Sequence, residues 1–161
     1  MTKSIDVLAM DLGAESGRTI LGKYDGTKLS LFEIHRFPNL SVRLPDGLHW
    51  DILYLFNEIK KGLQLGLVKA GDTVKGVGID TWGVDFGLLD SQGGLLGLPY
   101  HYRDSRTDGI MDEVFAIVPR ETVFDNTGIQ IMQINSLFQL YAMVKQNSPV
   151  LKNASTFLNI P

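Results

Sequence analysis

Hydrophobic and polar positions at the start of the chain follow a pattern that predicts three strands. An apolar run in Ile5–Met10 ends at Asp11, and a second run in Arg18–Lys23 follows a short polar turn. Lys28–Phe37 opens with apolar and polar residues in alternation, which is typical of a half-buried strand. The pair Asp25-Gly26 between the second and third runs favours a hairpin turn. The pattern therefore predicts a three-stranded antiparallel meander.

The next segment changes to the period of a helix. Residues 39–49 contain a proline and an Asp-Gly pair and are expected to form a loop. Asp51 then has the position of an N-cap, and apolar residues behind it recur at helical spacing, which predicts a helix over Ile52–Val68. Gly62 and Gly66 lie inside this helix at some cost in helix propensity. Close packing of the helix against a sheet would explain them.

A strand rich in Val, Ile and Gly follows the helix. Val74–Ile79 predicts a buried strand, and a helical crossover usually makes such a strand parallel to the one that it rejoins. Phe86–Leu89 and Leu95–Leu98 flank a turn and predict an additional hairpin. The order of elements indicates an α/β protein with a mixed sheet that opens with an antiparallel meander.

The remainder of the chain predicts mainly helices. Four further segments are expected: a helix over Asp108–Val118 that is stopped by Pro119, a short turn over Glu121–Asn126, a helix from Asn135 or Ser136 to about Gln146, and the start of another apolar element at Thr156–Ile160. The last residue, Pro161, falls inside what looks like the start of this element. We therefore expect the chain to be a piece of a longer protein.

Composition narrows the class of protein. The 161 residues are 44% hydrophobic and 20% charged, as in a single globular domain. The net charge of −3 and the lack of a basic cluster argue against nucleic acid or an anionic membrane as a partner. The absence of cysteine excludes a disulfide scaffold, a thiolate zinc site and a cysteine nucleophile. Residues 1–4 lead directly into the first strand, without the apolar core of a signal peptide. No run of the chain approaches the roughly 18 apolar residues of a membrane span, so a soluble cytoplasmic protein is expected.

The first candidate for chemistry is the glycine-bounded turn Gly13–Gly17. Such a turn can direct several backbone amides toward one point, which is what a phosphate requires. Asp11 precedes the turn and Arg18 follows it. The turn lacks the Gly-Lys-Ser/Thr ending of a Walker loop, and a strand rather than a helix follows it. An ordinary hairpin with a polar tip is the alternative interpretation, and this stretch alone does not decide between them.

The second candidate is the string Gly-Ile-Asp-Thr-Trp-Gly-Val-Asp-Phe at 78–86. Its two acids lie near the carboxyl end of a strand, where α/β sheets bind ligands. Gly83 would let a ligand hydroxyl approach the backbone closely, and Trp82 could present a flat apolar face to a sugar ring. The alternative is a packed strand end with a core tryptophan and two solvated acids, Asp80 and Asp85.

The third candidate is the polar and aromatic stretch Tyr100–Thr107. Its two arginines, two tyrosines and one serine could bind an anion or hydroxyl groups. The alternative is a helix entry with Asp104 or Thr107 as the cap and Arg106 on the surface. The three histidines of the chain have no metal-ligand spacing, and no Gly-x-Ser-x-Gly motif stands between a strand and a helix as a nucleophile elbow would require.

Together these stretches carry a family resemblance. Asp11–Arg18 resembles the first phosphate motif of the FGGY carbohydrate kinases, which are grouped with actin, hexokinase and the heat-shock chaperone ATPases. Three strings resemble the L-rhamnulose kinases within that family: Glu33–Phe37, Gly78–Phe86 and Tyr102–Thr107. The resemblance implies a ribonuclease-H-like fold that is incomplete here. Residues 1–161 would form the N-terminal part of the family's N-terminal domain, without the rest of that domain and without the C-terminal domain.

The resemblance also implies an activity and roles for residues. The activity is ATP-dependent transfer of the γ-phosphoryl group to the 1-hydroxyl of L-rhamnulose, with Mg²⁺, in rhamnose catabolism. The roles carried over by position are an ATP-phosphate cradle at Ala14, Glu15, Ser16, Gly17 and Arg18, a Mg²⁺ ligand at Asp11, a sugar contact at Gly83 with Trp82 and Asp85 nearby, and further cleft residues at Arg103 and Asn135.

Two departures from the family pattern limit what the resemblance implies. The family's catalytic base is an aspartate in a later motif that does not occur here, so this chain is expected to be inactive alone. Glu15 places an acid where many sugar kinases carry Thr or Ser, and repulsion from ATP should turn its side chain toward Arg18 or solvent.

Two alternative functions remain open. One is an FGGY kinase for another ketose or a deoxy sugar, and the other is a non-catalytic sugar or nucleotide sensor on the same fold. An actin-like or chaperone-like ATPase would leave the string Thr81–Phe86 unexplained.

Overall fold

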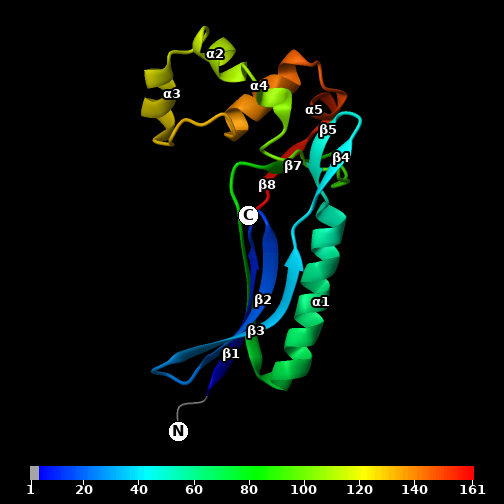
Figure 1. Ribbon diagram of the computed structural model, residues 1–161, viewed down its shortest axis with the longest axis vertical. Helices are drawn as coiled ribbons and strands as arrows, with labels where there is room; N and C mark the ends of the chain where they lie inside the picture. Colours follow the sequence, from blue (N-terminus) through cyan, green and yellow to red (C-terminus); the bar gives the residue numbers. More distant parts are fainter. Residues whose placement is uncertain (1–3) are drawn as a thin grey trace. The chain divides into compact units, whose positions relative to one another are not determined.

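The computed structural model describes residues 4–161, so residues 1–3, where the sequence shows no signal-peptide core, lie outside the described residues. The chain divides into two compact units. The first contains the described residues up to 40, residues 51–82 and Pro161, and the second contains residues 41–50 and 83–160. Each unit has hydrophobic clusters of its own, and Figure 1 shows the elements of both.

The first unit is built on a four-stranded mixed sheet. Its strands are β1 (Ile5–Leu12), β2 (Ser16–Tyr24), β3 (Leu29–Pro38) and β6 (Val74–Thr81), in the order β3-β2-β1-β6. The first three form an antiparallel meander, and β6 runs parallel to β1. The predicted mixed sheet and its opening meander are therefore confirmed.

Helix α1 (Ile52–Ala70) packs on β1, β2 and β3. Asp51 caps the helix by accepting a hydrogen bond from the Tyr54 amide. A Cβ atom on Gly62 would lie 1.9 Å from Thr19 Oγ1, and one on Gly66 would lie 2.6 Å from Leu8 Cδ2. The two glycines therefore let the helix approach the sheet closely, as the sequence predicted.

The sheet is not buried throughout, and β6 lies at its edge. Val77 and Ile79 share a face with Leu8 and Met10 by register. They are nevertheless more than half exposed, because α1 packs chiefly on the other three strands. The prediction of a buried strand here is wrong. A short 3-10 turn, η1 (Gly71–Thr73), leads from α1 into β6.

In the second unit, the strands form two antiparallel pairs. β4 (Ser41–Leu44) and β5 (Gly47–Trp50) pair where the sequence predicted a loop. β7 (Phe86–Leu89) pairs with β8 (Thr156–Asn159) and not with residues 95–98, which contribute only an isolated bridge between Leu95 and Leu89. The loop prediction is wrong because the Asp-Gly signal there belongs to a tight turn between two short strands. The hairpin prediction is wrong because β7 pairs with a strand far along the chain, which local pattern does not reveal.

The helices of the second unit are mostly short. They are η2 (Ser105–Thr107), α2 (Ile110–Phe115), α3 (Arg120–Thr127), α4 (Ser136–Lys145) and α5 (Pro149–Asn153). The helix predicted from Asp108 begins later because Gly109 has φ 74°, outside the helical region. The turn predicted over Glu121–Asn126 is helix α3, whereas α4 begins where it was predicted.

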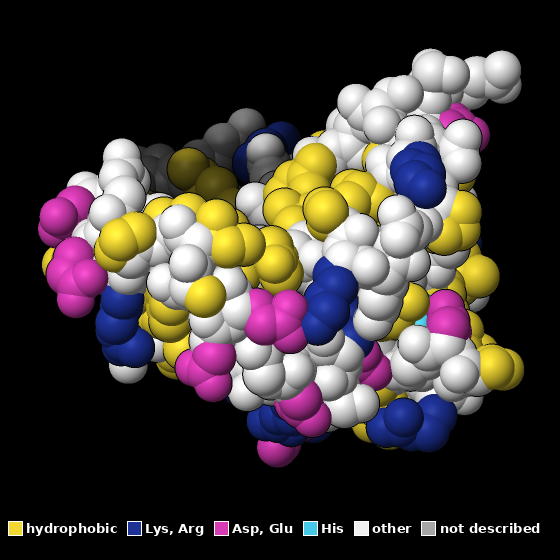
Figure 2. Space-filling model, turned by 90° about the horizontal axis from the view of Figure 1, so that it is seen from above, with side chains coloured by type: hydrophobic (Ala, Val, Ile, Leu, Met, Phe, Trp, Pro, Cys, Tyr) yellow, Lys and Arg dark blue, Asp and Glu magenta, His cyan; other side chains and the backbone are white. Residues whose placement is uncertain are grey.

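Two further observations concern the distribution of surface charge and the character of the helices. On the face seen in Figure 2, basic and acidic side chains are interspersed with hydrophobic ones and do not gather by sign. Within residues 4–161, none of the helices combines the length and the apolar character that crossing a bilayer requires.

Candidate functional site

In the turn between β1 and β2, carbonyl oxygens accept hydrogen bonds within the protein, whereas the amides of Ala14 and Glu15 remain available as donors. The Gly13 amide donates to Ser16 O at 3.0 Å and closes the turn. Asn39, which follows β3, stabilises the turn. Its amide donates to Glu15 O and its side chain donates to Gly13 O, each at 2.9 Å. Within residues 4–161, no hydrogen bond is donated by the amides of Ala14 or Glu15. The turn can therefore offer at least two donors to an anion.

Packing gives Gly17 a second role. A Cβ atom there would lie 2.2 Å from the Phe37 ring, which belongs to the cluster of Leu12, Phe37 and Leu55. Gly17 is thus required by the core of the unit. Glu15 is exposed to solvent, in agreement with one of the two expected orientations of its side chain.

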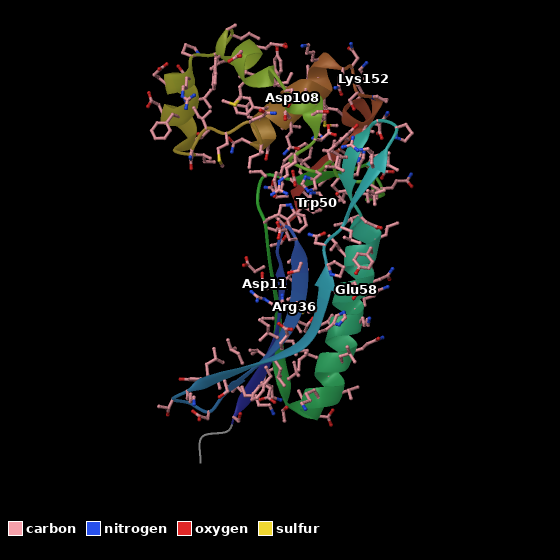
Figure 3. All side chains as sticks on the ribbon, viewed as in Figure 1. Asp11, Arg36, Trp50, Glu58, Asp108 and Lys152 are labelled. Carbon is pink, nitrogen blue, oxygen red and sulfur yellow. The ribbon has the colours of Figure 1, made fainter. Side chains whose placement is uncertain are left out.

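Asp11 and Arg18 form an ion pair across β1 and β2. The two residues are direct partners in the register, and Arg18 Nε and Nη2 lie 2.7 and 2.5 Å from Asp11 Oδ2. Arg36 on β3 pairs with Arg18 by register and donates to Glu33. Glu33, and to a smaller extent Asp11, raises the pKa of Arg36. Figure 3 labels Asp11 and Arg36 on this sheet.

Asp80 joins this group through the parallel pairing of β1 and β6. It is the register partner of Asp11, so both side chains leave the same face of the sheet. Sequence reasoning assigned Asp80 to a different motif, because a register between distant strands cannot be read from local pattern. Within the described residues, no three His, Asp or Glu side chains gather as a metal cluster. One or two carboxylates with water and phosphate oxygens are what Mg²⁺ usually takes, and Asp11 with Asp80 fits that donor set.

Trp82 follows β6 and packs against the cluster of Leu12, Phe37 and Leu55. Its side chain is partly buried there. At least part of the ring therefore belongs to the hydrophobic core of the first unit, as the packed-strand interpretation expected.

In the second unit, Gly83, Val84 and Asp85 form a tight turn. The Asp85 amide donates to Gly83 O at 2.9 Å, and Val84 has φ 68°. Gly83 is exposed, and within its own unit no heavy atom beyond its chain neighbours lies within 4 Å of a Cβ atom built on it. Within its unit, the space beside the Gly83 backbone is therefore open, and the sugar contact expected there stays a prediction.

A buried chain of hydrogen bonds begins at Asp85. Its carboxylate is fully buried and accepts from Trp50 Nε1 at 2.6 Å and from Gln139 Nε2 at 2.9 Å. Gln139 Oε1 in turn accepts from Arg106 Nη2 at 2.6 Å. Asp85 is therefore neither a solvated acid nor open to a ligand, and it acts on its surroundings through Trp50 and Gln139. Sequence reasoning missed both partners because they come from distant segments.

Arg106 lies in the interior of the second unit, so the alternative interpretation is wrong where it placed this residue on the surface. Its side chain is only 5% exposed, and its guanidinium carbon lies 3.7 Å from the centre of the Tyr100 ring. Burial lowers the pKa of Arg106. Asp104 caps η2 as predicted, because its carboxylate accepts from the Arg106 amide, and it also accepts from the Leu48 amide on β5.

Asn135 and Arg103 are the remaining candidates. Asn135 precedes α4 and accepts a hydrogen bond from the Met132 amide through Oδ1, and the adjacent Ser136 bonds to Val84 O. Asn135 is thus brought close to the Gly83 turn. Arg103 is exposed, with its guanidinium over the Tyr102 ring, and its amide donates to His101 Nδ1.

The candidate residues fall into two groups, one in each unit. Asp11, the turn Ala14–Arg18 and Trp82 belong to the first unit, and the other candidates belong to the second. Within the first unit, the structure joins Asp11 to Arg18. Within the second, it joins Asn135 to the turn at Gly83.

Comparison with known protein families gives one match along nearly the whole chain. A sequence profile described as the FGGY family of carbohydrate kinases, N-terminal domain, matches residues 7–161. Rhamnulokinase from Mannheimia succiniciproducens is 45% identical over 98% of this chain, and rhamnulokinase from Halalkalibacterium halodurans is 46% identical over 96%. The chain spans about a third of the length of these curated relatives, 33% and 32% respectively.

Solved structures share the fold at low sequence identity. Gluconate kinase from Lactobacillus acidophilus matches 97% of this chain with a TM-score of 0.81 and 12% identity. Glycerol kinase from Plasmodium falciparum, solved with ADP, matches 91% with a TM-score of 0.69 and 17% identity. The chain covers 31% and 30% of these two proteins.

Proposed function

We propose, because the chain belongs to the FGGY family of carbohydrate kinases, that it forms the N-terminal part of an ATP-dependent kinase acting on the 1-hydroxyl of L-rhamnulose. The observation that carries this proposal is the match to relatives named rhamnulokinase at 41–46% identity over nearly the whole chain. The solved gluconate and xylulose kinases share its fold at 12–18% identity. In this proposal the protein is a cytoplasmic enzyme of rhamnose catabolism.

ATP phosphates would bind at the turn between β1 and β2. The amides of Ala14 and Glu15 are available as donors, and Ser16, Gly17 and Arg18 complete the cradle. Phosphoryl transfer requires positioning and charge neutralisation more than covalent chemistry by the protein. Arg18 contributes a guanidinium at the edge of this turn, and Asn39 keeps the turn in shape through its two hydrogen bonds.

Asp11 would hold Mg²⁺, with Asp80 beside it as a second carboxylate. When bound, the ion supplies positive charge that neutralises the transferring phosphoryl group. The Asp11–Arg18 pair keeps the carboxylate in place on the sheet. Because both side chains of the pair are about two-fifths exposed, they remain accessible to a solvated ligand.

The sugar would contact Gly83, with Arg103 and Asn135 as further binding residues. The open space beside Gly83 supports this role. Trp82 and Asp85 would support the sugar site without contributing open side chains, since Trp82 packs in a core and Asp85 is buried. No residue of this chain is assigned as the catalytic base, and we place that group in the part of the kinase that lies beyond these residues.

A fusion protein tests the proposal. In it this chain replaces the corresponding N-terminal third of the Mannheimia rhamnulokinase, and ADP release is measured with a panel of ketoses. We expect turnover to be fastest with L-rhamnulose. Preference for another ketose would overturn the substrate, whereas binding of sugar or ATP without any ADP release would favour a sensor.

Asp11→Ala in this fusion tests the metal role. We expect kcat to fall by about tenfold to a hundredfold, as for the loss of a metal-positioning group. The melting temperature should change little, because a partly exposed ion pair contributes only about 0–1 kcal/mol. Glu33→Ala is the matched control, since it breaks the Glu33–Arg36 ion pair on the same sheet and should leave kcat unchanged. Near-normal turnover in Asp11→Ala would remove this residue from the site.

A further inference from the structure

A row of charged side chains crosses the sheet of the first unit. Four residues are register partners in turn: Arg36 on β3, Arg18 on β2, Asp11 on β1 and Asp80 on β6. Direct partners on neighbouring strands leave the same face of a sheet, so the four side chains form one row. Its two cations occupy one half and its two anions the other. Within the row, opposite charges are direct neighbours only at Arg18 and Asp11, which form an ion pair.

The neighbours of Arg18 explain why it pairs with Asp11. Arg36 stands opposite Arg18 on β3, and like charges directly opposite each other are unfavourable. Glu33 compensates the charge of Arg36 by accepting hydrogen bonds from its Nε and Nη2 atoms. Arg18 Nε donates to Asp11 Oδ2 at 2.7 Å, and Arg18 Nη2 lies 2.5 Å from the same oxygen. The guanidinium of Arg18 is therefore engaged by Asp11 in this structure.

This ion pair joins two residues that have different ligands in the proposed function. Arg18 would bind a phosphate group of ATP, and Asp11 would hold the divalent cation. While the pair is intact, the guanidinium repels a second cation from the carboxylate of Asp11. The carboxylate in turn repels a phosphate group that approaches Arg18. Each ligand therefore binds less favourably as long as the two side chains are paired.

The pair is exposed enough for a ligand to separate it. The side chain of Arg18 is 43% exposed and that of Asp11 is 37% exposed, and exposed ion pairs contribute little to stability. A phosphate group offers Arg18 charge-assisted hydrogen bonds to an anion of higher charge. Once Arg18 turns to phosphate, Asp11 loses its neutralising partner, and Asp80 beside it adds a second negative charge. The two carboxylates then attract a cation more strongly.

We propose, in an extension that rests on the proposed function, that the Asp11–Arg18 ion pair couples the binding of phosphate and divalent cation. A phosphate group opens the pair by binding Arg18, and the opened pair leaves Asp11 with a higher affinity for the cation. Coupling between two ligands is reciprocal. A cation held by Asp11 therefore releases Arg18 for phosphate.

The test measures Mn²⁺ binding to the fusion with the Mannheimia enzyme in the absence of nucleotide, by electron paramagnetic resonance of the free ion. Arg18→Gln removes the ion pair, and we expect the Asp11-dependent affinity for Mn²⁺ to rise about fivefold or more, as coupling between sites typically gives. Lys28→Gln is the matched control. It removes an exposed positive charge from the same unit, but Lys28 follows the end of β2 that pairs with Ile5. Its Mn²⁺ affinity should equal that of the parent.

Sulfate serves as the probe for the phosphate side, compared with chloride at equal ionic strength. In the parent fusion, sulfate should raise the Mn²⁺ affinity, because it draws Arg18 away from Asp11. In Arg18→Gln it should have no such effect. Adding Asp11→Asn to Arg18→Gln should remove the gain in affinity, because the gain acts through this carboxylate. The melting temperature of Arg18→Gln should change little, since the pair is exposed.

Three results would overturn the coupling. They are an Mn²⁺ affinity in Arg18→Gln that does not exceed that of the parent, a gain that persists when Asp11→Asn is added, and an effect of sulfate that does not require Arg18. A parent fusion that releases no ADP with L-rhamnulose would instead overturn the proposed function. The Mn²⁺ measurements require no turnover, so they decide the coupling separately from the activity.

Discussion

Burial sets the role of individual polar residues in the second unit. His101 is buried and stacks on Trp50, with ring centres 3.9 Å apart. Its Nδ1 accepts a hydrogen bond from the Arg103 amide, which requires that this nitrogen carry no proton. Burial, and then the charge of Arg103, lowers the pKa of His101 to about 4. The residue therefore acts as a neutral acceptor that fixes the Tyr100–Thr107 segment.

The lowered pKa of His101 predicts a loss of stability in mild acid. Between about pH 6.5 and about pH 4 the unfolded chain binds a proton at this position and the folded chain does not, so stability falls as pH is lowered. We expect the melting temperature to drop between about pH 7 and about pH 5. The drop should be smaller in His101→Asn, which keeps an acceptor near the same place.

Acidic groups contribute to the pH dependence in a lower range. Asp6 and Glu33 have lowered pKa values because of hydrogen bonds to Thr73 and Arg36, respectively. Their stabilisation is lost only as pH falls below their ordinary values near 4. Differential scanning calorimetry above about pH 5 therefore separates His101 from these carboxylates, and the difference between the parent and His101→Asn assigns the effect to this residue. Equal slopes in the parent and in His101→Asn would contradict its assignment as a buried neutral base.

At the scale of elements, the close contact between α1 and the sheet depends on glycines of α1, which have no side chain. Alanine at Gly62 would gain about 1 kcal/mol in helix propensity, but its Cβ would lie 1.9 Å from Thr19 Oγ1 and 3.0 Å from Thr19 Cβ. Thr19 is fully buried and cannot move aside freely. Overpacking costs typically about 1–3 kcal/mol, so we expect Gly62→Ala to lower the free energy of unfolding by about 1–2 kcal/mol.

Gly78→Ala is the matched control for Gly62→Ala. Nothing lies within 4 Å of a Cβ atom built on Gly78, so urea unfolding should show an unchanged or slightly higher midpoint for this variant. A stabilised Gly62→Ala would mean that helix propensity outweighs packing. In that case the spacing between α1 and the sheet would not depend on glycine.

Local signals in the sequence predicted the first unit well. The cap at Asp51, the turn at Asp25-Gly26 and the paired glycines of α1 each act over a few residues, and the structure confirms all three. Features set by distant partners were not predictable in this way. The register that places Asp80 beside Asp11 and the pairing of β7 with β8 join segments about 70 residues apart, a separation over which pattern carries no signal.

The candidate site shows the same division between local and distant signals. The turn at Ala14–Arg18 and the open position at Gly83 could be proposed from residue types in a row. The burial of Arg106 could not, because it depends on Tyr100 and on Gln139 of α4. The residues next to an arginine in the sequence are the same whether its side chain is buried against distant partners or exposed, so local sequence does not reveal its burial.

At the scale of the whole molecule, the 161 residues contain the two groups of candidate residues but no assigned base. The chain spans about a third of the curated relatives, and phosphoryl transfer needs every part of the machinery in position. We therefore expect the isolated chain to release no ADP from ATP in the presence of L-rhamnulose. The fusion with the Mannheimia enzyme, assayed at the same concentration by coupled ADP detection, is the positive control.

Activity in the isolated chain would place the base among these residues. Asp80 would then be the first candidate, because it is exposed and stands beside Asp11 on the sheet, whereas Asp85 is fully buried and held by two donors. Asp80→Asn would abolish such activity if Asp80 were the base. In the fusion, by contrast, Asp80→Asn should weaken the dependence on Mg²⁺ without abolishing turnover, since there the carboxylate would support the metal and the base would come from the added two thirds of the protein.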